Sequence, residues 1–246
     1  MQMITLLYPA FILAILLVFV HAIFGLEIIK RGVIFTDLAI GQFAAVGVAV
    51  SLLLFEGHYI FLLTFLFALI GALLITLATY RVKHIEAFIG MLYALGASSI
   101  MILLANTGQG TELFSKLQAT DILFTSASDL WEPLVLYSAV GLLFFLFHHR
   151  LTGFYREALF FGLLALTVTS SVQLAGILVV FVLLIVPAFV ALLQGRFSKL
   201  PFAWVLGSMI IIAAMVVSYY FDLPTGYTIV FIASLAGVSS ALVFKG

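Results

Sequence analysis

Runs of about twenty apolar residues recur along almost the whole chain, and they limit what it can fold into. A helix that spans a bilayer needs about 20 predominantly apolar residues. Runs of this kind occupy residues 4–29, 32–55, 58–80, 86–106, 131–148, 201–220 and 225–244. With 65% hydrophobic and only 8% charged residues, the chain has too little polar surface to cover itself in water. We therefore expect an all-α polytopic membrane protein.

One longer apolar run, residues 157–194, decides the number of spans. It is too long for one helix of ordinary tilt and long enough for two short ones, and its most polar point is Thr-Ser-Ser-Val-Gln at 169–173, where we expect a turn. Positive loop residues favour the cytoplasmic side, and the basic loops alternate correctly if 157–194 crosses twice. The sequence predicts nine spans with the N-terminus outside, or eight as the alternative, in a single transmembrane domain over residues 1–246.

Charge and motifs exclude several functions. The formal net charge is zero, which gives no electrostatic reason to bind nucleic acid, and there is no cysteine for disulfides or thiolate chemistry. The chain contains neither a Walker A phosphate loop nor a His-Glu-x-x-His zinc motif. We expect a protein that is not itself an enzyme and holds no tightly bound cofactor.

Asp37 is the charged residue that most needs an explanation. It lies about one and a half turns inside an apolar segment that starts after Arg31. A charge at the centre of a spanning helix costs at least about 2.5 kcal/mol, so such residues usually face a water-filled path or a partner. The alternative is an interfacial acid that pairs with Lys30 or Arg31. Asp37 is the first candidate for a residue that touches a transported ion.

Two other polar residues in these segments, His21 and Glu86, have both a structural and a functional interpretation. His21 lies deep in the first apolar run and is either a ligand or proton carrier, or a hydrogen-bond donor to a neighbouring helix. Glu86 starts the fourth run, where an acid is favoured by the helix dipole. Of these two, His21 joins Asp37 as a candidate site residue.

The stretch Phe-His-His-Arg-Leu-Thr-Gly-Phe-Tyr-Arg-Glu (147–157) is a short basic connector on the predicted inside. Adjacent histidines on a helix point about 100° apart, so His148 and His149 are poorly placed for one shared metal site. The connector is either an ordinary cytoplasmic loop or a docking surface for a soluble partner.

Three segments together resemble a known family. Residues 30–50 are similar to a motif with Arg, Phe and Asp in the register of Arg31, Phe35 and Asp37. Residues 170–193 resemble a signature that ends in Leu-Ile-Val-Pro-Ala, and residues 219–244 resemble an ending of the type Leu-Asp-x-Pro-x-Gly. The combination is similar to the ABC-3 permeases, the membrane subunits of zinc and manganese importers of the ATP-binding-cassette type.

The resemblance implies a fold, a function and partners. The fold is the type II helical bundle, like that of the vitamin B12 importer, in the plasma membrane or cell inner membrane. The function is passage of zinc or manganese through a homodimer that a cytoplasmic ATPase drives and an extracytoplasmic metal-binding protein supplies. A different class also remains open, a stand-alone secondary carrier or channel that uses Asp37 and His21 as a relay.

The chain departs from the family motif near Asp37. Gly41 stands where the family has a histidine four residues after the Asp, and the step from Asp37 to Gly47 is one residue longer. Gln42 is then the remaining candidate ligand, but residues i and i+5 diverge by about 140° on a regular helix. We expect a one-residue π-bulge that would bring Gln42 back to the face of Asp37.

The second departure is in the connector after residue 147. The stretch keeps Glu157, Ala158 and Gly162 of the family's ATPase-facing element, but the helix-length piece that follows in the family is absent. We expect either a shorter coupling helix within 149–158 or an altered ATPase contact. The resemblance assigns ATPase docking to four residues: His149, Arg150, Arg156 and Glu157.

Overall fold

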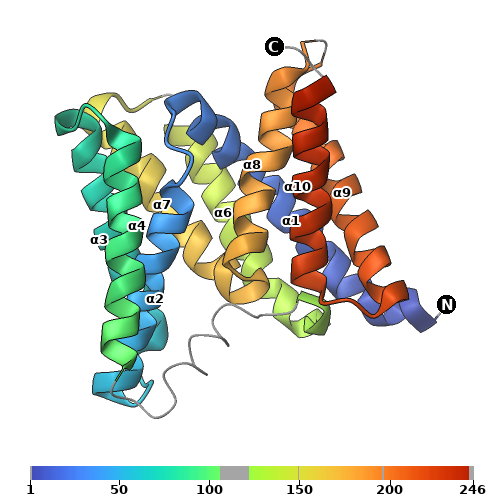
Figure 1. The fold of residues 1–246 in the computed structure, drawn as a ribbon, viewed down its shortest axis with the longest axis horizontal. Coiled ribbons are helices and arrows are strands. Elements are labelled where there is room, and N and C mark those ends of the chain that lie inside the picture. Colours follow the sequence, from blue (N-terminus) through green and yellow to red (C-terminus); the bar gives the residue numbers. More distant parts are fainter. Residues whose placement is uncertain (1, 106–121, 149, 196, 244–246) are drawn as a thin grey trace. The chain divides into compact units, whose positions relative to one another are not determined.

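The computed structural model describes residues 2–105, 122–148, 150–195 and 197–243, and these residues are almost entirely helical (Figure 1). Two short 3₁₀ turns, η1 (Ile122–Phe124) and η2 (Ala127–Leu130), precede α6. The α-helices of the described ranges are α1 (Gln2–Arg31), α2 (Thr36–Phe55), α3 (Ile60–Arg81), α4 (Ile85–Leu104), α6 (Trp131–Phe147), α7 (Gly153–Ala175), α8 (Ile177–Leu193), α9 (Lys199–Phe221) and α10 (Thr225–Val243).

Eight helical segments of the described residues are long and apolar enough to cross a membrane. The segment Ala127–Phe147 reaches this length because η2 runs directly into α6, whereas α8, with 17 residues, is shorter. The prediction of an all-α membrane protein with eight to nine spanning helices is confirmed.

The break inside the long apolar run is at Gly176 and not at 169–173, so the predicted turn position was wrong. Gly176 has a φ of 84°, which a residue without a β-carbon adopts without strain. The polar side chains of the expected turn lie within α7 instead. Thr167 donates to the carbonyl oxygen of Leu163 at 2.9 Å, and Ser171 donates to that of Thr167 at 2.7 Å. Hydroxyls bound to their own helix need no turn to reach a partner.

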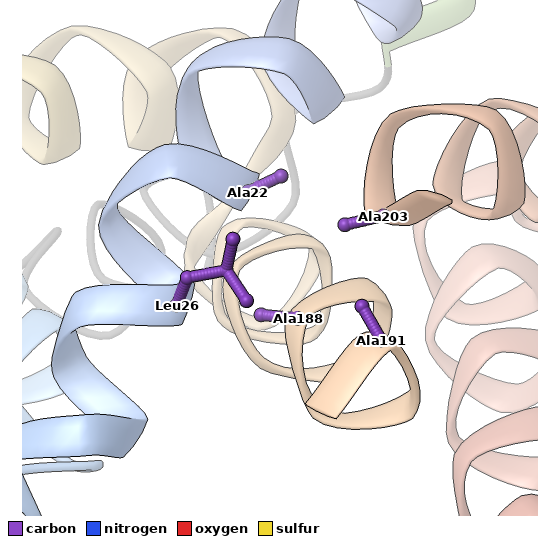
Figure 2. Close-up of a cluster of buried hydrophobic side chains, with 5 residues drawn as sticks. All are labelled: Ala22, Leu26, Ala188, Ala191 and Ala203. Atoms are coloured by element: carbon purple, nitrogen blue, oxygen red, sulfur yellow. The ribbon is translucent and has the colours of Figure 1, made fainter. Parts of the chain in front are cut away.

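The chain divides into two compact units. The first unit contains residues 1–31, 119–138 and 174–246, and in it α1, α8, α9 and α10 pack side by side (Figure 1). Small residues set the spacing of α1, α8 and α9. Figure 2 shows Leu26 of α1 between Ala22 and the alanines of α8, with Ala203 of α9 closing the cluster.

A proline and a glycine fit together in the same unit. A β-carbon on Gly207 of α9 would lie 2.9 Å from the Cγ atom of Pro187 in α8 and 2.6 Å from a methyl group of Val18 in α1. The close approach of α1, α8 and α9 at this point therefore requires a glycine at position 207.

The second unit contains residues 32–118 and 139–173, with α2 packed against α3 and α4 (Figure 1). A β-carbon on Gly47 of α2 would lie 2.4 Å from the carbonyl oxygen of Leu63 in α3. On the α4 side, Ala45, Val46 and Ala49 pack against Ile100 and Leu104. α2, which carries Asp37, thus packs closely against α3 and α4 of its own unit.

Candidate functional site

Asp37 lies in the first turn of α2, and the preceding turn places it there. Gly32 has a φ of 65°, which ends α1, and both the backbone N–H and the hydroxyl of Thr36 donate to the carbonyl oxygen of Val33, at 3.2 and 2.7 Å. The Asp37 side chain is only 2% exposed, and its Oδ1 atom accepts no hydrogen bond from the described residues. A buried carboxylate oxygen without a donor is costly unless something else binds it.

α2 is a regular α-helix from Thr36 to Phe55, so the expected π-bulge between Asp37 and Gly47 was wrong. Gly41 and Gln42, at and next to the position of the family's histidine, face different neighbours of α2. Gly41 faces α7, since a β-carbon there would lie 3.8 Å from a methyl group of Val168. Asp37 and Gly41 share one face of α2 because they are four residues apart.

Gln42 points elsewhere. A β-carbon on Gly96 of α4 would lie 2.8 Å from the Cβ atom of Gln42, so this side chain starts toward α4. Gln42 is 3% exposed, and its Oε1 atom has no hydrogen-bond partner within the described ranges. The structure keeps Gln42 buried and polar but does not bring it to the face of Asp37. Its role as a metal ligand stays a prediction.

His21 lies on α1, in the other compact unit. It is fully buried, and its Nδ1 atom donates to the carbonyl oxygen of Leu17 at 2.7 Å, one turn earlier in the same helix. This bond holds the ring against its own backbone. A role of His21 in metal passage stays a prediction. In the described part of the chain, no three His, Asp or Glu residues group closely enough to hold a metal ion.

Lys30 and Arg31, the basic residues at the end of α1, form ion pairs with an acidic residue of the same helix. Glu27 pairs with Lys30 at 3.2 Å and with Arg31 at 3.6 Å, as one-turn spacing favours.

The candidate docking segment joins α6 to α7. Arg150 is exposed, and Arg156 pairs with Glu157 at 3.4 Å in the first turns of α7. Because α7 already begins at Gly153, residues 150–152 leave no room for a separate coupling helix of the expected kind, while His149 lies outside the described residues. Tyr155 is 72% exposed, and Phe154 contacts Tyr80 at the end of α3 with ring centres 6.1 Å apart. These aromatic residues were missed because an apolar sequence makes them look like ordinary lipid contacts.

Glu86 was also underestimated. Its Oε1 atom accepts a hydrogen bond of 2.6 Å from the backbone N–H of Ile34, which is 52 residues earlier and three residues before Asp37. An acidic residue in the first turn of a helix is predictable from the sequence. The contact of Glu86 with the N–H of Ile34 is not, because it depends on the packing of α2 against α4.

The eight apolar segments of the described residues that are long enough to span a bilayer define a multi-pass membrane protein, and its similarity to a transport family and to transport-system relatives assigns it to the plasma membrane. The profile of the ABC 3 transport family matches residues 154–244. These residues include α7 to α10 and both of the C-terminal motifs, and the match confirms the resemblance to the ABC-3 permeases.

Individual relatives extend this likeness over most of the chain. The manganese transport system membrane proteins MntC of Listeria monocytogenes and of Listeria innocua are each 26% identical to it, over 93% of this chain and 87% of theirs. PsaBC from Streptococcus pneumoniae, solved in complex with Fab, has the same fold with a TM-score of 0.75, at 24% identity over 96% of this chain and 90% of that chain.

Proposed function

We propose that this chain is the membrane permease subunit of an ATP-driven importer of a divalent metal ion, and that Asp37 lies on the ion's path. The observation that carries the proposal is the buried Asp37 oxygen without a donor on a spanning helix. The manganese transport relatives support the cargo class. ATP hydrolysis falls to a partner, because the chain has no phosphate-binding loop of the Walker type. The complete importer has two copies of this chain, cytoplasmic ATPase subunits and an extracytoplasmic metal-binding protein.

We further propose manganese rather than zinc as the preferred cargo. The face of α2 that carries Asp37 has Gly41 in place of the family's histidine, so its ligand is an oxygen. Carboxylate and carbonyl oxygens suit Mn²⁺, while imidazole suits Zn²⁺. A path with an oxygen ligand also binds weakly enough to release the ion, which conduction requires.

Substitution of Gly41 by histidine tests this preference. The β-carbon fits, because its nearest neighbour would be 3.8 Å away, and the imidazole would be one turn from Asp37. We expect zinc to block manganese uptake by Gly41→His at concentrations about tenfold lower than for the parent protein, since a second, nitrogen ligand strengthens zinc binding. Uptake of radioactive manganese at increasing zinc concentration measures the effect. Gly41→Ala adds the same β-carbon without a ligand and is the control; equal zinc inhibition of both variants would contradict the proposal.

The exposed aromatic and basic residues at the start of α7 are the proposed ATPase contact. Arg150 and Arg156 supply charge, and Tyr155, next to Phe154, supplies an exposed aromatic ring. Tyrosine and arginine are enriched among the residues that dominate interface energies. With the family's longer coupling piece absent, this short surface carries more of the contact.

Tyr155→Ala is expected to weaken ATPase binding at least tenfold, about the loss of one strong interface residue. Titration of the ATPase against the permease in lipid nanodiscs measures it. Tyr220→Ala is the matched control. Tyr220 is 70% exposed and lies at the C-terminal end of α9, on the predicted outer side of the membrane. If both variants bind the ATPase like the parent, the contact is elsewhere.

Uptake assays decide between the importer and a stand-alone carrier. Cells that contain this chain with its ATPase are expected to take up manganese, and cells with an ATPase unable to hydrolyse ATP are not. Uptake that is the same without an active ATPase would overturn the importer and favour the carrier.

A further inference from the structure

A hydrogen bond between Glu86 and Ile34 connects two segments that are far apart in the sequence. The predicted topology places both segments on the cytoplasmic side. The carboxylate of Glu86 stands in the first turn of α4, and the N–H of Ile34 lies in the turn between α1 and α2. The donor–acceptor distance is 2.6 Å, and the acceptor is an acidic side chain, so the bond is of the strong, charge-assisted type when Glu86 is ionised. Both residues belong to the second compact unit.

A dipole role alone does not account for this arrangement. Glu132 also stands in the first turn of its helix, α6, but its side chain is exposed. Glu86 is partly buried, and its Oε2 atom has no hydrogen-bond partner among the residues described, while its Oε1 atom reaches a backbone amide far away in sequence. An acid that served only the helix dipole would need no such contact.

The turn that Glu86 holds is the one that orients Asp37. Ile34 is followed by Thr36, which binds Val33 through its backbone and its hydroxyl, and Asp37 comes next. Ile34 precedes α2, so its N–H has no place in the helix's own hydrogen bonds. The Glu86 carboxylate satisfies it and anchors the start of α2 to α4.

We propose that Glu86 is a positioning residue for metal transport: through the Ile34 amide it fixes the start of α2 and thereby the direction of the Asp37 carboxylate. The inference rests on the proposed function in so far as Asp37 contacts the metal. The hydrogen bond requires an acceptor oxygen and not a charge, and this separates positioning from direct metal binding by Glu86.

The first test compares Glu86→Ala with Glu86→Gln in manganese uptake driven by the ATPase. Misplacement of a functional group by about 1 Å can cost on the order of 100-fold, so we expect Glu86→Ala to raise the half-saturating manganese concentration about tenfold or more. Glu86→Gln keeps an acceptor oxygen and is expected to recover most of that loss. Glu132→Ala is the matched control for a first-turn acid. Equal impairment of both Glu86 variants, or of neither, would overturn positioning.

The second test does not depend on transport. The chain has no cysteine, so Asp37→Cys introduces a single thiol. We expect a small water-soluble thiol reagent to label it faster when Glu86→Ala is added, and at the parent rate when Glu86→Gln is added. Unchanged labelling with Glu86→Ala would overturn the inference. If labelling changes while Asp37→Asn transports normally, positioning holds and the path role of Asp37 fails.

Discussion

Asp37→Asn is expected to abolish ATPase-driven manganese uptake and to leave the protein in the membrane. The exchange keeps the size of the side chain and removes the charge that would bind the ion. Loss of an outer contact to a metal ligand already costs 10–100-fold, so removal of the carboxylate itself is expected to cost on the order of 100-fold or more. Uptake of radioactive manganese, normalised to the amount of permease in isolated membranes, measures it.

Insertion of Asp37→Asn should not fail, because removal of a charge from a spanning segment lowers the cost of insertion. Glu27→Gln is the matched control. Glu27 forms one-turn ion pairs with Lys30 and Arg31, and such partly exposed pairs contribute only about 0–1 kcal/mol. We expect this control to transport like the parent protein. Full uptake by Asp37→Asn would mean that the carboxylate is an anchor at the interface and that the ion passes elsewhere.

Gly25→Ala is expected to have the largest effect on stability. A β-carbon on Gly25 would lie 1.9 Å from the carbonyl oxygen of Leu184 in α8 and 3.0 Å from the Cβ atom of Ala188. A backbone oxygen cannot rotate away, so α1 and α8 must separate, which also opens the alanine cluster of Figure 2. Overpacking of a core typically costs 1–3 kcal/mol, and we expect about 3 kcal/mol or more here.

Thermal unfolding of the purified protein, followed by loss of the folded peak in size-exclusion chromatography, measures the effect of Gly25→Ala. Gly90→Ala is the control, since a β-carbon at this helical position meets nothing within 4 Å. It is expected to leave stability unchanged or to raise it by up to about 1 kcal/mol through helix propensity. Gly237→Ala, with Val186 at 3.3 Å, is expected to fall between the two. Identical unfolding of all three variants would contradict the close approach of α1 and α8.

The spanning segments were predictable because a continuous apolar run of about 20 residues spans a bilayer as a helix, which satisfies all of its own backbone hydrogen bonds. The junction between α7 and α8 was not. The polar cluster at 169–173 suggested a turn, but it lies within α7, where the hydroxyl of Ser171 donates to the carbonyl oxygen of Thr167. The break falls at Gly176 because the backbone there has a positive φ, and polarity does not report on that requirement.

The candidate site was predictable only in part. The cost of burying a charge identified Asp37 as a candidate from the sequence. In the structure this side chain is buried, and its Oδ1 atom has no hydrogen-bond donor among the described residues. The direction of Gln42 was not predictable, because it depends on whether one extra residue is absorbed by a bulge or by a change of packing partner. The contact of Glu86 with Ile34 depends on which helices are neighbours. Such choices are made by tertiary packing, which a local pattern does not encode.

The close fit of α2 limits how Asp37 can move. Rotation of α2 by one residue, about 100°, would carry a valine into the place of Gly47, where even a single carbon would meet the Leu63 carbonyl oxygen at 2.4 Å. Gly71 of α3 also lies against Phe43, and Gly96 of α4 lies against Gln42. These contacts with α3 and α4 prevent α2 from rotating about its own axis while its neighbours stay in place. A change in the Asp37 position by rotation of the whole of α2 therefore requires α3 and α4 to move with it.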